Sequence, residues 1–172
     1  MSASEDILRS GLERIAVFDT SALIQVKAAV SPQRQWEFFE IMKERVQQGH
    51  LYFPRAVLEE LRGHRHHDTP ETWAFNVYGH MSGAIEPSTR TLQEVMRIAG
   101  DVVEPDAEGD PADPYVLAQA LEFQQSGRWV LVVTEDRVDR VPIKIAMTTA
   151  CERLGLTAWS LADFLGEIGF DP

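Results

Sequence analysis

The sequence predicts an α/β fold, a three-layer α/β/α sandwich with a mainly parallel central sheet. Short apolar runs rich in Val, Ile and Leu alternate with segments whose apolar residues recur at helical spacing. Such runs are typical of strands that helices cover on both faces, and their alternation with helices is typical of parallel sheets. We expect residues 1–172 to form a single domain, with 1–13 as a polar lead-in and 63–87 as a helical insertion.

Four runs are predicted to be strands because they are apolar, rich in β-branched residues and bounded by polar or turn-forming residues. The run at 129–133 is apolar throughout, which indicates a central strand with cover on both faces. The predicted strands cover residues 14–18, 50–53, 129–133 and 156–159.

The segments between the strands carry signals for helix starts and stops. Ser31 and Pro32 supply a hydroxyl cap and a proline at the first helical position. Ser160 and Asp163 form a capping box for the closing helix. The other predicted helices cover residues 20–29, 32–48, 55–62, 69–81, 88–99, 111–125 and 144–154.

Composition limits the class of protein. The net charge of −11 argues against sequence-independent nucleic-acid binding through bulk positive charge, but it is compatible with local clusters of carboxylates that bind cations. No apolar run approaches the roughly 20 residues of a membrane span. We therefore expect no membrane association.

The N-terminal residues are polar and acidic, unlike a signal peptide. Cys151 is the single cysteine, so no intrachain disulfide forms, and a cytoplasmic location is expected. Its helical pattern predicts a small core residue. The four tryptophans also lie in apolar patterns, which predicts core or dimer contacts rather than base stacking; they are Trp36, Trp73, Trp129 and Trp159.

An acid lies near each of four α/β junctions. Asp19 ends the first strand, Glu60 lies on the helix after the second, Asp113 begins a long helix, and Asp136 follows the run at 129–133. Because parallel strands place their carboxyl ends at one edge of the sheet, we expect these acids to meet. Carboxylates in one crevice repel each other unless cations lie between them, and Mg²⁺ or Mn²⁺ suits an all-oxygen site. Two such ions can activate a water and stabilise the leaving oxygen in phosphodiester cleavage.

Each acid taken alone is equally well interpreted as a helix cap or part of a solvated face, and only the joint pattern favours a metal site. Glu59 points about 100° away from Glu60 on a helix, which predicts a solvated side chain. Glu135 is interpreted as a near neighbour of the site and Asp110 as a helix cap.

Four motifs resemble those of the PIN-domain ribonucleases, in the same order and spacing over nearly the whole chain. The motifs are Val17-Phe18-Asp19-Thr20-Ser21-Ala22-Leu23-Ile24, Pro54-Arg55-Ala56-Val57-Leu58-Glu59-Glu60-Leu61, Ala112-Asp113-Pro114-Tyr115-Val116-Leu117-Ala118-Gln119-Ala120 and Val133-Thr134-Glu135-Asp136. The resemblance implies a PIN-like α/β/α sandwich and a Mg²⁺- or Mn²⁺-dependent endoribonuclease that hydrolyses RNA with a metal-activated water. The long middle region resembles a branch of the superfamily apart from the short toxins.

The resemblance also implies the roles of the acids. Asp19, Glu60 and Asp113 would be inner metal ligands, and Asp136 would bind through a second ion or through water. Val138 stands where the fourth motif usually carries a further acid, with Asp139 one position later. One tightly held ion is therefore expected.

Several polar side chains near the acids are candidates for substrate contacts. The hydroxyls of Thr20 and Ser21 would bind a phosphate or orient Asp19, with a helix cap as the alternative for Ser21. Arg137 and Lys144 are candidates for a phosphate contact, but a solvated face is the favoured interpretation of both. The histidines of the loop around residues 64–67 (His64, His66 and His67) are interpreted as a basic loop that touches RNA phosphates, because no pattern fixes them in a tetrahedral site.

Relatives of the VapC type are toxins held by a cognate antitoxin, and they often dimerise, so the resemblance implies a basic protein partner and a homodimer. The alternative is a catalytically weak or inactive PIN-like module that binds RNA or a protein. A phosphatase of the haloacid-dehalogenase type is disfavoured, because Ser21 stands where that class needs a second Asp. The first junction also lacks the Gly-rich turn of a dinucleotide-binding enzyme.

Overall fold

The structure is a computed structural model that describes residues 14–63, 68–81 and 86–172. The predicted lead-in at 1–13 and the loop histidines His64, His66 and His67 lie outside the described residues. Within the predicted insertion at 63–87, residues 64–67 and 82–85 are not described. The described residues of this interval include one helix, Thr69–Tyr78.

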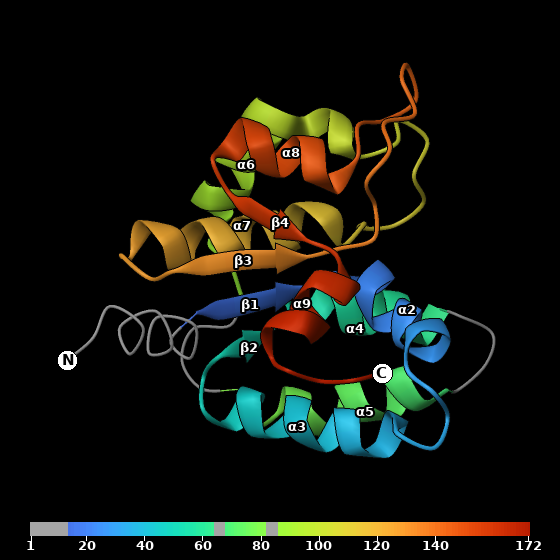
Figure 1. The fold of residues 1–172 in the computed structure, drawn as a ribbon. Helices are drawn as coiled ribbons and strands as arrows, with labels where there is room; N and C mark the ends of the chain where they lie inside the picture. Colours follow the sequence, from blue (N-terminus) through green and yellow to red (C-terminus); the bar gives the residue numbers. More distant parts are fainter. Residues whose placement is uncertain (1–13, 64–67, 82–85) are drawn as a thin grey trace.

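The sheet has four parallel strands in the order β2-β1-β3-β4 (Figure 1). Each strand lies where an apolar run predicts it, and β3 is internal, as its wholly apolar sequence indicates. The strands are β1 Ile15–Phe18, β2 Leu51–Tyr52, β3 Val130–Val133 and β4 Thr157–Trp159.

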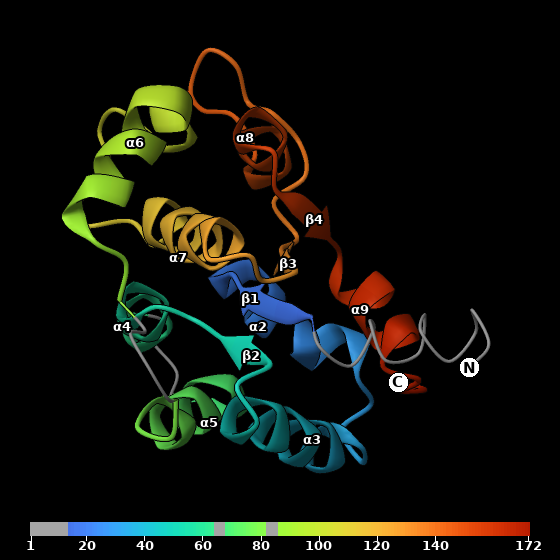
Figure 2. The same cartoon turned by 90° about the vertical axis from the view of Figure 1, so that its left-hand side faces the viewer.

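Helices cover both faces of the sheet, which gives the predicted three-layer α/β/α sandwich. Helix α7 lies on one face with α6 and α8, and α3 and α9 lie on the other (Figure 2). The helices are α2 Thr20–Ala29, α3 Gln35–Gln47, α4 Arg55–Gly63, α5 Thr69–Tyr78, α6 Thr89–Ala99, α7 Asp113–Gln125, α8 Met147–Leu154 and α9 Leu161–Glu167, with a 3₁₀ turn at Gly100–Val102.

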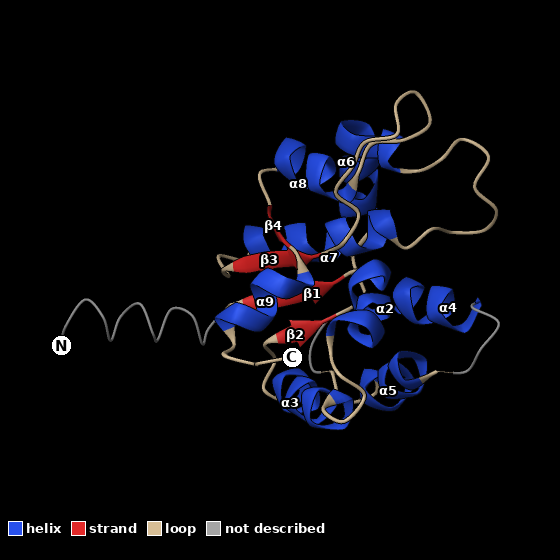
Figure 3. Cartoon of the chain, turned by 45° about the vertical axis from the view of Figure 1, so that its right-hand side comes forward, coloured by secondary structure: helices blue, strands red, loops and turns tan. Residues whose placement is uncertain are grey.

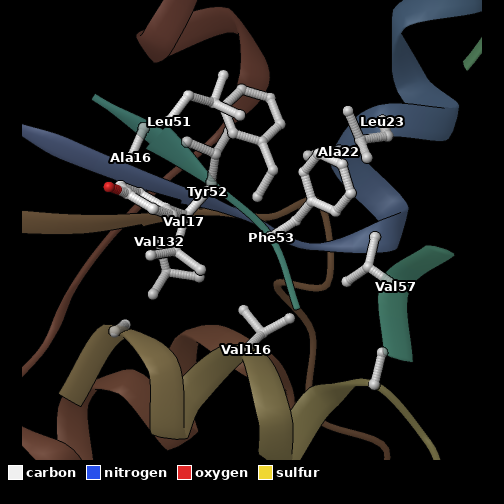
Figure 4. Packing of buried hydrophobic residues seen from close by; sticks show 14 of the residues in the cluster. Ala16, Val17, Ala22, Leu23, Leu51, Tyr52, Phe53, Val57, Val116 and Val132 are labelled. Carbon is white, nitrogen blue, oxygen red and sulfur yellow. The ribbon is translucent and has the colours of Figure 1, made fainter. Parts of the chain in front are cut away.

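The core explains why the central strands are apolar on both faces. Val17 and Val132 are paired across β1 and β3 and point towards Val116 of α7 (Figure 4). On the opposite face, the ring of Phe18 packs edge-to-face on Phe164 of α9, with centroids 5.0 Å apart. Both faces of β1 are therefore buried, and the strand is held firmly where Asp19 leaves it.

Helices α3 and α8 begin three residues later than the sequence predicts, and α7 begins two residues later, at Asp113. The backbone N–H of Arg34 donates to Ser31, which closes a turn, so α3 begins at Gln35 rather than at Pro32. Helix α8 begins at Met147 rather than at Lys144. Lys144 is instead paired with Arg140 in an antiparallel bridge, because the chain doubles back before the helix.

The prediction of a core position holds for Trp73, which is buried, but it is wrong for Trp36 and Trp129, which are 75% and 61% exposed. A dimer contact stays a prediction for these two. Cys151 is buried as predicted, and burial raises the pKa of its thiol to about 12. None of the helices in the described part of the chain has the length and apolarity needed to cross a membrane.

The predicted capping box of α9 is present. The Ser160 hydroxyl accepts a hydrogen bond from the backbone of Asp163, and the Asp163 carboxylate accepts one from the backbone of Ser160. We expect Ser160→Ala to lower the free energy of unfolding by about 1 kcal/mol, measured by urea denaturation. Ser160→Thr, which keeps the hydroxyl that accepts from the Asp163 N–H and donates to its carboxylate, should lose less. Equal losses in the two variants would show that the cap contributes nothing.

Candidate functional site

The carboxyl ends of β1 and β3 bring Asp19 and Thr134 side by side. The two strands are parallel and paired up to Phe18 and Val133, and the backbone N–H of Asp19 donates to the Val133 carbonyl at 3.0 Å. All strands point towards the side from which α2 and the long loops before α7 and after β3 extend (Figure 3). This is the edge at which ligands bind in open α/β sheets.

Asp19 is 3% exposed, and its carboxylate is held by two hydroxyls. Its Oδ2 accepts hydrogen bonds from Ser21 Oγ at 2.6 Å and from Thr134 Oγ1 at 2.8 Å. Burial raises the pKa of Asp19; the two hydroxyls oppose this rise, and the negative charge of Glu60 adds to it. The two hydroxyls therefore orient the Asp19 carboxylate, and the contacts described here give it no positively charged partner.

The side chain of Glu60 links its own helix α4 to α2 and to the start of α7 at the same edge. Its Oε2 accepts from Thr20 Oγ1 at 2.6 Å, and its Oε1 accepts from the backbone N–H of Ala112 at 2.8 Å. Glu59 is exposed and pairs with Arg55 on the outer side of α4 at 2.9 Å. The prediction that Glu60 faces inward and Glu59 is solvated is confirmed.

Asp113 and Asp136 share one cation, Lys144. Its Nζ lies 3.1 Å from Asp113 Oδ2 and 2.9 Å from Asp136 Oδ2, and the lysine side chain is 11% exposed. Burial alone would lower the pKa of Lys144, but the two carboxylates outweigh burial and raise it. The solvated-face alternative for Lys144 is therefore wrong.

The carboxyl of Asp113 also has a raised pKa. Burial, and after it the charge of Asp19, raise its pKa to about 7; Lys144 opposes the rise and Glu60 adds to it. Three carboxylates thus act on one another electrostatically at this edge. The structure brings Asp19, Glu60 and Asp113 together as the junction argument expects, with Asp136 linked to them through Lys144.

The donor set fits a hard divalent cation in chemical type, because it consists of carboxylate and hydroxyl oxygens. Within the described ranges, however, no three His, Cys, Asp or Glu side chains are arranged as a metal-binding group. The carboxylates stay apart because each has its own partner. Thr20 donates a hydrogen bond to Glu60, and Lys144 forms an ion pair with Asp113. A cation at this edge would require these carboxylates to move closer together, with Asp113 offering the oxygen that Lys144 does not contact.

Of the residues predicted to contact substrate, Thr20 and Ser21 lie at the acids and Arg137 is exposed. The hydroxyls of Thr20 and Ser21 face Glu60 and Asp19, and Ser21 orients an acid rather than capping a helix. Arg137 is exposed and lies near Asp163, whose pKa is lowered chiefly by hydrogen bonds to Ser160. A phosphate contact by any of these side chains stays a prediction.

The neighbouring acids serve the backbone. Glu135 accepts a hydrogen bond from the Leu161 N–H at the start of α9, which confirms its place as a near neighbour of the site. Asp139 accepts from the Ala146 N–H and from the Thr149 hydroxyl, both at 2.7 Å. Asp139 therefore orders the loop before α8.

Thr134 belongs to the fourth motif, but the sequence reasoning gave it no role in the site. It is fully buried, donates to Asp19 and accepts from the backbone N–H of Asp136 at 3.1 Å. The signal that could have found it is a hydroxyl directly after the apolar run of β3, at the same level of the sheet as Asp19 after β1.

No curated protein matches the chain. One family model does, described as a domain of unknown function, DUF4411, and it matches residues 17–171. The matched segment begins at Val17 in β1, just before Asp19, and extends beyond α9, so it contains all the elements that position the acids. The chain therefore belongs to the DUF4411 family.

Proposed function

We propose that this protein is a PIN-like endoribonuclease that uses Mg²⁺ or Mn²⁺ to hydrolyse RNA phosphodiester bonds. The observation that carries the proposal is that Asp19, Glu60 and Asp113 lie at one edge of the sheet, where burial, and after it the charges of Asp19 and Glu60, raise the pKa of Asp113 to about 7. Buried carboxylates that repel each other destabilise the folded state, and such groups cluster at sites that bind a cation or exchange a proton.

In this proposal the divalent cation is held by the carboxylates of Asp19, Glu60 and Asp113. The hydroxyls of Ser21 and Thr134 serve as outer partners that orient Asp19, as second-shell groups do around metal sites. When bound, the cation supplies a hydroxide nucleophile by lowering the pKa of its water. No nucleophile from the chain is then required.

RNA as the substrate rests on the resemblance of the four acidic motifs to PIN-domain ribonucleases. The net charge of −11 fits a basic protein partner, such as an antitoxin, and a cytoplasmic location and a homodimer belong to the same proposal. The second candidate is an inactive PIN-like module that binds RNA or a protein. The ion pairs of Lys144 with Asp113 and Asp136 favour that candidate, because the ammonium already neutralises part of the acidic cluster.

The test compares two adjacent glutamates. Purified protein is incubated with single-stranded and structured RNA in Mn²⁺, in Mg²⁺ and with chelator. We expect cleavage only with a divalent cation, a loss of more than about 100-fold in Glu60→Gln, and no change in Glu59→Gln, because removing a group next to a metal already costs 10- to 100-fold.

Cleavage that persists in chelator, or that is equally reduced in both glutamate variants, would contradict the metal-nuclease proposal. RNA binding without cleavage under every condition would favour the inactive module.

A further inference from the structure

Lys144 lies where a cation is electrostatically needed. Its ammonium contacts Asp113 at the start of α7 and Asp136 in the loop after β3, so it joins two junctions at the same edge of the sheet. The side chain is only 11% exposed, so water screens these contacts much less than it screens a surface ion pair. The lysine thus supplies one fixed positive charge on one side of the acidic cluster.

The backbone around Lys144 keeps the ammonium in place. Lys144 N–H donates to the Arg140 carbonyl at 3.2 Å, and Arg140 N–H donates to the Lys144 carbonyl at 2.9 Å. On the C-terminal side, the Ile145 N–H donates to the Asp101 carbonyl, and the Ala146 N–H donates to the Asp139 carboxylate. Asp139 therefore holds the segment that carries the lysine, which explains why this acid does not face the other carboxylates.

The four acids divide into two sets. Asp19 and Glu60 accept hydrogen bonds only from neutral donors in the contacts described above, whereas Asp113 and Asp136 each contact the ammonium. A divalent cation gains most where negative charge has no cationic partner, which is on the side of Asp19 and Glu60, whose charges also act on Asp113. On the Asp136 side a second cation would meet the lysine instead.

We infer that the Lys144 ammonium takes the place of a second divalent cation, so that the centre binds one metal ion and one fixed lysine charge. This inference rests on the proposed metal site. In it, Lys144 is a positioning residue that holds Asp113 and Asp136 and supplies the charge which a second ion would bring. The exposed Val138 stands where the fourth PIN-like motif usually carries a further acid, which is consistent with a single ion.

The test counts Mn²⁺ ions by isothermal titration calorimetry and reads their coupling by electron paramagnetic resonance. We expect one ion in the wild-type protein, two ions with the spin coupling of a close pair in Lys144→Met and Lys144→Gln, and one ion in Lys144→Arg, which keeps the charge. Arg140→Met is the matched control, because Arg140 lies in the same loop but pairs with the exposed Glu104 at 2.9 Å. It should bind one ion.

Two coupled ions in the wild-type protein, or one ion in both neutral Lys144 variants with native circular dichroism, would overturn the inference. A folded wild-type protein that binds no Mn²⁺ at all would instead overturn the metal site of the proposed function. The two failures are therefore distinguishable without any measurement of cleavage.

Discussion

Asp19→Asn is expected to reduce RNA cleavage by more than about 100-fold while the fold stays intact, since even an outer partner of a metal contributes 10- to 100-fold. Asparagine keeps the volume and one oxygen, so it can still accept a hydrogen bond from Ser21 or Thr134. It loses the negative charge that the cation needs. The measurement is the initial rate of cleavage in Mn²⁺, with the exposed Asp110→Asn as the control.

The same substitution should not destabilise the protein when divalent cations are absent. The pKa of Asp19 is raised by burial, despite the hydrogen bonds from Ser21 and Thr134, and Glu60 raises it further, so the ionised carboxylate costs folding energy near neutral pH. Removing that charge should leave the free energy of unfolding in chelator unchanged or increased. A large loss of stability together with the loss of cleavage would instead make Asp19 a structural residue.

The fold was predictable because its signals are local. The four apolar runs are bounded by polar residues, and both capping residues of the closing helix are visible in the sequence, so β1 to β4 and α9 lie where they are expected. The starts of α3 and α8 were not predictable to the residue. A turn at Ser31 and a chain reversal at Arg140 compete there with the helix, and the reversal depends on tertiary contacts such as the Ile145 bond to Asp101.

The site was predictable in part for a topological reason. Parallel strands bring their carboxyl ends to one edge, so acids at separate junctions can be expected to meet without knowledge of any side-chain geometry. The role of Lys144 depends on the path of the loop after β3, which carries no periodic signal. The role of Thr134 could not be assigned from its motif, because the sequence does not show that its hydroxyl reaches the Asp19 carboxylate.

Asp113 should make the cation-free protein less stable as the pH rises. Its pKa is raised from 3.8 to about 7, so the folded state keeps a proton that the unfolded state has already lost between these values. Because the folded state then binds more protons, stability falls from about pH 4 to about pH 7, by up to about 4 kcal/mol for this group alone. Asp113→Asn lacks the titrating group and should lack this part of the decrease.

The comparison of wild type and Asp113→Asn reports on Asp113 together with its coupling to Asp19 and Lys144. Acids outside the cluster, such as Asp139, contribute equally to both proteins. Urea denaturation in chelator should show that the stability advantage of the variant grows by roughly 2 to 3 kcal/mol between about pH 5 and about pH 7.5. Mn²⁺ should then stabilise the wild type more than the variant, since binding to the folded state adds to its stability. A variant that is less stable at both pH values would mean that the ion pair with Lys144 outweighs the burial and repulsion of Asp113, so the carboxylate would serve the fold rather than a cation.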